Sequence, residues 1–522
     1  MLSMKKQEKQ QTSNKSPFIK ITAILCAVLT SVSLASCSRG ETKLYEKDDA
    51  LSQSIAYSAA DNKTPTDSLR IGWSQSSSLN PFFVTANLNY DAMCLMYQSL
   101  YKTDSAYIPY EQIAKSSAFK DPQNLTVELN SSIHFSDSSP LTASDVVYSF
   151  NQAKNSDIYS QQLKNIDSVT SSGTYTLNVK LNTADKFIKN VLTFPIVKSG
   201  TASSKDSIPV GSGMYKYSSD SKLVCNPSYS GSKPSVGTVE LYPVSESATL
   251  ALALESGNID CVFDDLSSGS YLKVAASNVG VNLNNLVYLG MNSSSSALSL
   301  PQVRQAVNFA VNRVDIVSDC YSGFASNAYT VFNPKWSEYF NSGYDESELA
   351  LNYDSASAML KSAGYPQCNL TLIVNEDNTF RSLAADKIKE SLKNVNINVT
   401  VSKLTWSEYT QALSDGNYDL YLGEMKFSDN MDLSALFTTY GVASSSPSAA
   451  AYQQYKNSQI TMRDFLNIFN SDIPLAPICY RQGVFIYSRN ISGRLDCTYG
   501  NIFKNLDEWS VTETKSETNA EE

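Results

Sequence analysis

The segment from residue 285 to 317, NLVYLGMNSSSSALSLPQVRQAVNFAVNRVDIV, constrains the fold most, because it predicts a buried strand, a polar turn and an amphipathic helix in succession. Residues 286–291 are an apolar run interrupted by Gly290, which is typical of a buried strand that passes close to another backbone. Pro301 stands where the first turn of a helix tolerates a missing N–H. Apolar side chains then recur at helical spacing, at Val303, Val307, Ala310, Val311 and Val314. Such a strand–helix unit is typical of a large α/β protein.

The same alternation continues toward the C-terminus. Strands and helices are expected in turn at residues 370–374, 379–392, 397–401, 405–413 and 418–422. Alternation of this kind predicts a layer rich in parallel strands. A chain of 522 residues is also too long for one hydrophobic core and predicts two or three domains.

The charge of the chain argues against two classes of partner. The net charge is −10, and the first 36 residues carry five Lys and one Glu, so the remainder stands near −14. A chain this acidic has no electrostatic footprint for nucleic acid. It would also be repelled by an anionic membrane surface, so any attachment to a membrane needs a separate anchor.

Residues 1–36 predict a lipoprotein signal peptide that provides this anchor. A basic stretch precedes the apolar residues 21–34, which are shorter than the roughly twenty needed to span a bilayer. The sequence Leu34-Ala35-Ser36-Cys37 resembles a bacterial lipobox, in which the cysteine becomes the lipidated first residue. An ordinary secretory signal with a chance cysteine is the alternative. We expect an extracytoplasmic chain anchored to the bacterial membrane at Cys37, with polar residues 37–68 as a flexible tether.

The remaining residue types give little support to catalysis. The single histidine, His134, argues against a Ser-His-Asp or Cys-His device and against a His-rich metal site. Phosphate-binding Walker and Rossmann loops are missing from the sequence, and Asp264-Asp265 is more typical of a solvated turn than of a glycosidase pair. We therefore predict no enzyme activity, no cofactor and no metal.

Seven cysteines remain after Cys26 and Cys37 are set aside, and they are widely scattered. The one pair expected as a candidate disulfide is Cys479 and Cys497, since both fall on expected neighbouring strands.

Several phrases together resemble the family 5 extracytoplasmic solute-binding proteins, the peptide, dipeptide and nickel-chelate receptors of ABC importers. They are the lipobox, FSDSSPLTASDVV (135–147), PVGSGMY (209–215), VRQAVNFAVNR (303–313), AGYP (363–366) and YDLYLGE (418–424). The sequence departs from the family pattern at Asn80, where Asp usually precedes the proline, and at Ser138, where Gly is usual. Within the second phrase, Thr142 and Asp145 have capping-box spacing, which supports the fold rather than any chemistry.

The resemblance implies an α/β, two-lobed periplasmic-binding-protein-like fold of type II, cluster C. It implies lobe one at residues 69–285, with an inserted subdomain at about 85–190, and lobe two at 286–475. Residues 476–510 would return to lobe one, and the acidic residues 511–522 would be a disordered tail. Closure of the two lobes about a hinge would bury a ligand between them.

The segment GEMKFSDNMDLSALF (423–437) is where a ligand is expected. Peptide-binding members of the family usually carry an acidic residue there, often within W-x-x-D-Y-x-D-P, which pairs with the ligand's α-ammonium. This chain lacks the Trp, Tyr and Pro but keeps Glu424, Asp429 and Asp432, of which Asp429 and Asp432 are the leading candidates. Lys426 is expected either to pair with a ligand carboxylate or to neutralise Glu424. For each of these side chains, a solvated loop is the alternative.

Aromatic and polar side chains near expected strand ends are further candidates for the ligand wall. These are Trp73, Trp406, Tyr288, Asn292 and Ser76. Core packing is the alternative for each tryptophan.

The predicted function is capture of an oligopeptide and its delivery to an ABC permease and its ATPase by a monomeric receptor. The alternatives are a surface sensor or adhesin with the same fold, a receptor for a sugar, opine or metal chelate, and a surface hydrolase on a similar scaffold.

Overall fold

The computed structural model describes residues 63–244, 247–440 and 446–514. The expected signal peptide, the lipidation site Cys37 and most of the expected tether lie outside these residues. Among the described residues, no helix is both long and apolar enough to cross a membrane.

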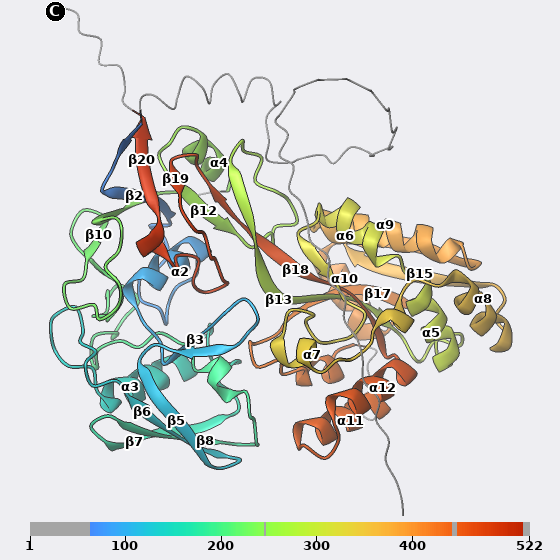
Figure 1. Cartoon of the computed structure of the whole chain (residues 1–522). Coiled ribbons are helices and arrows are strands. Elements are labelled where there is room, and N and C mark those ends of the chain that lie inside the picture. The colour runs from blue at the N-terminus through green and yellow to red at the C-terminus, as the bar shows by residue number, and fades with distance from the viewer. Residues whose placement is uncertain (1–62, 245–246, 441–445, 515–522) are drawn as a thin grey trace, which may run out of the picture. The chain divides into compact units, whose positions relative to one another are not determined.

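An eleven-stranded mixed sheet forms the framework of the protein (Figure 1). Its main path is β16-β15-β17-β13-β18-β12-β2-β11-β10-β9, and β14 (Ala325–Asn327) joins it at β18. Lobe one contains β2 (Ser68–Trp73), β9 (Tyr215–Tyr217), β10 (Lys222–Cys225), β11 (Thr238–Pro243) and β12 (Cys261–Asp264). Lobe two contains β15 (Cys368–Asn375), β16 (Ile397–Leu404) and β17 (Leu420–Lys426).

Two long antiparallel strands, β13 (Ser277–Met291) and β18 (Leu475–Tyr487), connect the lobes. Their pairing is regular from Ser277 to Asn282, and register shifts follow between Asn282 and Leu286 and between Val287 and Tyr288. In β13, Val281 and Leu283 belong to one hydrophobic core, while residues 286–289 and Met291 belong to the other. The irregular stretch therefore lies where the strand passes from one core to the other. Irregularities of this kind bend strands, so it is a natural place for a hinge.

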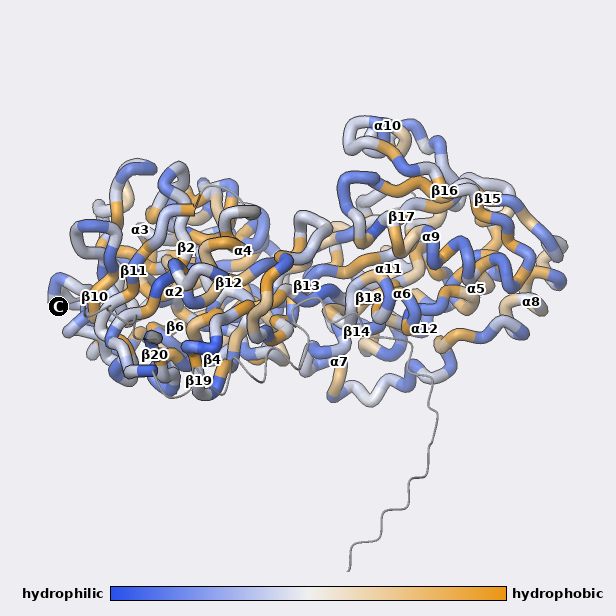
Figure 2. The backbone as a smooth tube through the Cα atoms, turned by 90° about the horizontal axis from the view of Figure 1, so that it is seen from above, coloured by the Kyte–Doolittle hydropathy of each residue, from blue (hydrophilic) through white to orange (hydrophobic). Residues whose placement is uncertain are grey.

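The predicted strand–helix alternation in lobe two is confirmed. α9 (Thr379–Lys393) and α10 (Trp406–Asp415) alternate with β15, β16 and β17, and β15 pairs in parallel with both of its neighbours. Pro301 opens α5 (Pro301–Ala310), as its spacing predicts. The other lobe-two helices are α6 (Arg313–Tyr321), α7 (Ser337–Asn341), α8 (Tyr353–Ser362), α11 (Pro447–Lys456) and α12 (Met462–Asp472). Figure 2 shows hydrophobic residues concentrated in β15, β17 and the faces of the helices packed on them.

Gly290 is required for a different reason from the expected one. A Cβ atom at Gly290 would lie 2.0 Å from the ring of Tyr421 on β17. The close approach predicted for this glycine is therefore made by an aromatic side chain rather than by another backbone.

Lobe one also carries a four-stranded antiparallel sheet of order β5-β6-β8-β7. Its strands are β5 (Ala114–Asp121), β6 (Asn124–Leu129), β7 (Ile166–Gly173) and β8 (Thr176–Leu181). α3 (Ala143–Lys154) follows the predicted cap, and Asp145 Oδ2 accepts a hydrogen bond of 2.9 Å from the Thr142 N–H. α2 (Asn87–Met96), α4 (Ser247–Glu255) and the hairpin of β3 (Tyr101–Thr103) and β4 (Pro109–Glu111) complete this lobe.

The chain ends of the described region differ from the expectation. β20 (Ser510–Thr514) pairs with β1 (Lys63–Pro65) and β19 (Ile491–Ser492), so an ordered strand occupies positions assigned to the tether and to the disordered tail. Val511 is buried in the lobe-one core and holds this strand in place. The acidic residues around Val511 gave no indication of a strand in the sequence.

The candidate disulfide between Cys479 and Cys497 is not formed, since both cysteines are free. Cys479 is buried on β18 in the core that includes lobe two, whereas Cys497 packs against the lobe-one core. We expect intact-mass analysis after alkylation in denaturant to show every described cysteine modified without prior reduction. Adducts on fewer of these cysteines until a reductant is added would contradict this prediction.

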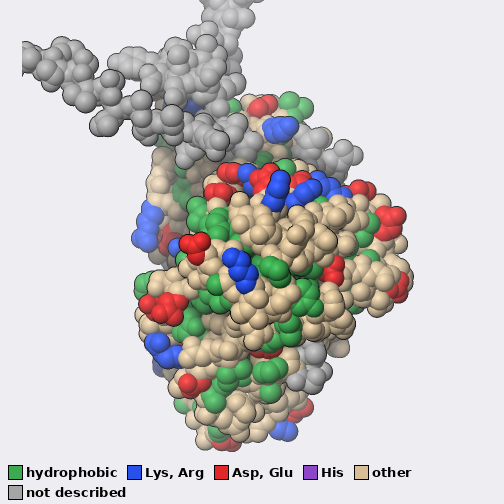
Figure 3. Space-filling model, turned by 90° about the vertical axis from the view of Figure 1, so that its right-hand side faces the viewer, with side chains coloured by type: hydrophobic (Ala, Val, Ile, Leu, Met, Phe, Trp, Pro, Cys, Tyr) green, Lys and Arg blue, Asp and Glu red, His purple; other side chains and the backbone are tan. Residues whose placement is uncertain are grey.

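Charged side chains of both signs are interspersed among uncharged polar ones on the face of the molecule in Figure 3.

Candidate functional site

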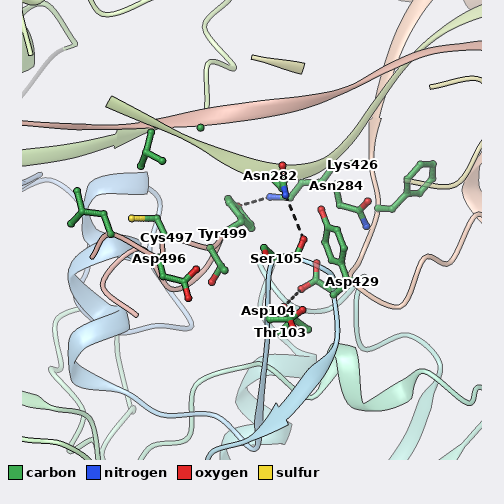
Figure 4. Close-up of a pocket in the computed structure, with 16 residues that line it drawn as sticks. Thr103, Asp104, Ser105, Asn282, Asn284, Lys426, Asp429, Asp496, Cys497 and Tyr499 are labelled. Carbon is green, nitrogen blue, oxygen red and sulfur yellow. Dashed lines mark hydrogen bonds between the residues drawn. The ribbon is translucent and has the colours of Figure 1, made fainter. Parts of the chain in front are cut away.

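A cavity with walls from both lobes has a volume of about 550 Å³. Lobe one contributes residues 84–87, Tyr90, 102–103, 499–500 and several residues between Ile158 and Thr193, and lobe two contributes Lys426 at the end of β17 and the loop that follows it, as far as Ala435. A second cavity of about 210 Å³ shares Thr103, Lys426, Phe427, Asp429 and Tyr499 with the first (Figure 4). We call these two adjacent spaces the interlobe cavity.

Hydrogen bonds from other elements to its backbone hold the loop after β17 in place. The Phe427 N–H donates to the Asn284 carbonyl of β13 at 2.8 Å, and Asn284 Nδ2 donates to the Ser428 carbonyl at 3.0 Å. Asn190 of lobe one donates to the carbonyl of Asp429 at 3.1 Å. These bonds fix the positions from which the side chains of Lys426, Asp429 and Asp432 enter the cavity.

Asp429 and Asp104 are carboxylates of the interlobe cavity that form no salt bridge with the described residues, and Asp104 Oδ1 already accepts from the N–H groups of Ala106 and Ile108. Thr103 Oγ1 donates to Asp429 Oδ2 at 2.7 Å (Figure 4), and the described residues form no salt bridge with it. Burial raises the pKa of Asp429, and the Thr103 hydrogen bond and the charges of Lys426 and Lys102 only partly offset this. A cationic group of a ligand would therefore stabilise the ionised carboxylate.

Asp432 is already neutralised by the protein. Its two oxygens lie 3.4 Å from Lys456 Nζ and 3.4 Å from Lys164 Nζ, and the Ser434 N–H donates to it at 3.0 Å. Burial opposes the ionisation of Asp432, but Ser434, Lys456 and Lys164 outweigh it and lower the pKa to about 2. The pair with Lys164 joins lobe two to lobe one.

Lys426 also bridges the lobes. Its ammonium lies 3.9 Å from the centroid of the Tyr499 ring and donates to the Tyr499 hydroxyl (Figure 4). It therefore does not neutralise Glu424, which was one of its two expected roles. The other expected role is pairing with a ligand carboxylate, which requires the Lys426 ammonium to leave Tyr499 and bind the ligand instead.

Glu424 belongs to a largely buried ion network rather than to the cavity wall. It accepts hydrogen bonds from Arg481 at 2.7 Å, from Arg381 at 3.2 Å and from Asn285 at 2.8 Å. Burial opposes its ionisation, but Arg481 outweighs this effect and holds the pKa of Glu424 below its ordinary value. Glu424, one of the three acidic residues predicted to contact a ligand, is therefore engaged in structural salt bridges and hydrogen bonds.

The remaining predicted residues lie outside the interlobe cavity. Tyr288 is only 4% exposed and packs edge-on against Tyr421, with 5.8 Å between ring centroids. Trp406 is 59% exposed on α10, and Asn292 donates to the carbonyls of Gly416 and Tyr418. Trp73 packs against the lobe-one core, and Ser76 pairs with Ser74 at 2.9 Å.

Sequence reasoning did not identify the lobe-one side of the cavity. Thr103, Lys164, Asn190 and Tyr499 come from loops and a hairpin that are far apart in the sequence. None of them belongs to a motif, and only the fold brings them opposite the loop after β17.

Tyr107 is one of several lobe-one residues in the hydrophobic core that includes lobe two. Tyr107 lies at the turn of the β3–β4 hairpin with a φ of 59° and is 6% exposed. Its hydroxyl accepts a hydrogen bond of 3.1 Å from Asn333, and Asn190 donates to its carbonyl. The neighbouring Ala106 carbonyl accepts from the Ser337 N–H of α7 at 3.0 Å. We call this hairpin turn the Tyr107 clasp.

Comparison with known proteins identifies the kind of molecule that has this arrangement. Residues 109–447 match the family described as bacterial extracellular solute-binding proteins, family 5 Middle. The chain is 26% identical to the oligopeptide-binding protein AppA of Bacillus subtilis over 425 residues, which cover 70% of this chain and 77% of AppA.

Solved structures give the same picture of the fold. A putative peptide binding protein AppA from Clostridium difficile superposes with a TM-score of 0.68 at 19% identity, covering 85% of this chain and all (100%) of that one. The Bacillus subtilis AppA in complex with a nonapeptide superposes with a TM-score of 0.57 at 20% identity, covering 86% of this chain and 100% of AppA.

Proposed function

Because the chain belongs to the family 5 bacterial extracellular solute-binding proteins of ABC importers, which are not enzymes, we propose that it captures an oligopeptide in the interlobe cavity. Asp429 would receive the peptide's α-ammonium group. The supporting observation is a carboxylate without a salt bridge in the described structure, placed where walls from both lobes meet.

We further propose that closure about the irregular stretch of β13 and β18 traps the peptide. The Lys164–Asp432 pair and the contact between Lys426 and Tyr499 join the lobes in the closed form. A ligand shifts such an equilibrium only as far as it binds the closed form better than the open one. Selectivity would then come from contacts gathered on both walls.

The cellular setting is part of the same proposal. Residues 1–36 would be removed and Cys37 lipidated, so that a monomer works at the membrane surface and delivers its cargo to an ABC permease. Lobe one would comprise residues 69–285, with an inserted subdomain at about 85–190, and residues 476–510. Lobe two would comprise residues 286–475.

The test uses the protein from residue 38 onward. Native mass spectrometry of protein purified from its host is expected to reveal a bound peptide. Calorimetry is then carried out with this peptide and with its N-acetylated form. We expect acetylation to weaken binding at least about 30-fold, because it removes the charge that Asp429 would pair with. Equal affinity for the two forms, or a bound glycan or chelate in place of a peptide, would reject the proposal.

A further inference from the structure

A third cavity, of about 180 Å³, opens beside the interlobe cavity. The two spaces share the wall residues Asn165, Asn430 and Asp432. Lobe one lines the third cavity with Phe119, Pro122 and residues 184–187, and lobe two with Trp336, Met431 and residues of α11. The two cavities are therefore adjacent, with the three shared residues between them.

Aromatic side chains form part of the wall of this side pocket. Phe187 meets Trp336 edge-on, with 5.0 Å between ring centroids, and Trp336 is only 2% exposed. On α11, Tyr452 and Tyr455 lie 6.3 Å apart, and Tyr455 stacks on Phe465 at 5.8 Å. These contacts fix the rings from behind, so the pocket is a preformed apolar surface rather than a gap between mobile side chains.

Polar groups also line the pocket. The Tyr455 hydroxyl has no hydrogen-bond partner among the described residues and almost no accessible surface, so a ligand would meet the Tyr455 ring rather than its hydroxyl. Asp185 accepts hydrogen bonds of 2.8 Å from Asn430 Nδ2 and 2.9 Å from the Phe187 N–H. At the shared rim, Asp432 is neutralised by Lys164 and Lys456.

We propose that this side pocket selects the cargo by accepting an aromatic side chain of the peptide, close to its N-terminal residue. Aromatic rings gain free energy from edge-to-face contact with fixed aromatic walls, beyond the burial of their area. The proposal rests on peptide capture at Asp429 and adds the identity of a preferred side chain.

The experiment measures affinities by calorimetry for a tetra-alanine peptide and for versions with one phenylalanine or one tyrosine at position 2, 3 or 4. We expect one position to improve binding about 10-fold or more over alanine. Phe187→Ala should reduce this preference to less than about 3-fold. Phe340→Ala, a control at a 76% exposed residue, should leave the preference intact.

The variant Tyr455→Phe keeps the ring and removes only the hydroxyl, so it is expected to fold like the wild type. Because this hydroxyl has almost no accessible surface, the variant should keep the aromatic preference of the wild type. If all the peptides bind the wild type with equal affinity, the side-pocket proposal is wrong while peptide capture stands. If no peptide binds, the proposed function itself is wrong. An aromatic preference that survives in Phe187→Ala would place the selecting surface elsewhere.

Discussion

Replacing Asp429 with asparagine is expected to remove tight peptide binding and yet leave the empty protein at least as stable as the wild type. Loss of one partner from a desolvated charge pair typically costs about 2–5 kcal/mol of binding free energy. This corresponds to a loss of affinity of roughly 30-fold or more. The Thr103 hydroxyl can still donate to the amide oxygen of asparagine, so the local structure should persist.

The stability of the empty protein follows from the direction of the pKa shift. Burial raises the pKa of Asp429, so the ionised carboxylate destabilises the folded state at neutral pH. The protonated Asp429 side chain contributes to the stability of the folded protein. This contribution is complete below the pKa of Asp429 in the unfolded chain and is lost as the pH rises through its pKa in the folded protein. The asparagine side chain does not ionise and avoids this loss, so the melting temperature of empty Asp429→Asn should equal or exceed that of the wild type at neutral pH.

Thermal unfolding with and without peptide checks both halves of this prediction. Saturating peptide should raise the wild-type melting temperature and leave that of Asp429→Asn unchanged. Wild-type affinity should also weaken as pH falls through the raised pKa of Asp429, while Asp429→Asn shows no such dependence. Asp206→Asn, at an exposed position, is the matched control and should bind like the wild type. Full affinity in Asp429→Asn would mean that the ammonium site lies elsewhere.

The second large effect is expected at the ion network behind the loop. Arg481 is 4% exposed at its side chain and lies 2.6 Å from Glu424, and it also donates to the Asp265 carbonyl at 2.8 Å. Arg481→Ala leaves a buried carboxylate that keeps only Arg381 and Asn285 as partners among the described residues. Breaking a buried pair in this way costs about 3–5 kcal/mol of unfolding free energy.

Urea denaturation compares this variant with Arg494→Ala. Arg494 is 69% exposed at its side chain and 3.4 Å from Asp496, so its loss should cost less than about 1 kcal/mol. The pKa of Glu424 is held below its ordinary value, so the stability from its ionised form is present above the unfolded pKa and is lost as pH falls through the folded one. The gap between wild type and Arg481→Ala should therefore narrow in acid. Equal losses of unfolding free energy in the two variants would show that the buried Arg481–Glu424 pair stabilises the protein no more than the exposed Arg494–Asp496 pair.

The sequence predicted several helices and strands well because their signals are local. The opening proline of α5, the alternation from β15 to β17 and the cap of α3 depend on residues within a few positions of one another. β20 was missed because a strand among acidic residues is recognised only through its partners β1 and β19, which are distant in sequence.

The site was predicted in part for the same reason. The loop after β17 supplies Lys426, Asp429 and Asp432 to the cavity, as expected. The role of each acidic residue could not be predicted from the sequence. Arg481 and Arg381, which form salt bridges with Glu424, come from other elements of the fold. The opposite wall has no motif at all, since Thr103 and Tyr499 are joined only by the fold.

The Tyr107 clasp has a consequence for an importer. If the lobes separate as proposed, every opening event moves the Tyr107 ring into water, at a cost of about 1.5–3 kcal/mol, whether or not a peptide is present. An empty receptor would then spend part of its time shut and would resemble a loaded one. The permease would then have to distinguish closed receptors without peptide from closed receptors with peptide. A more stable Tyr107 clasp would also lower the fraction of empty receptors that are open and able to bind peptide.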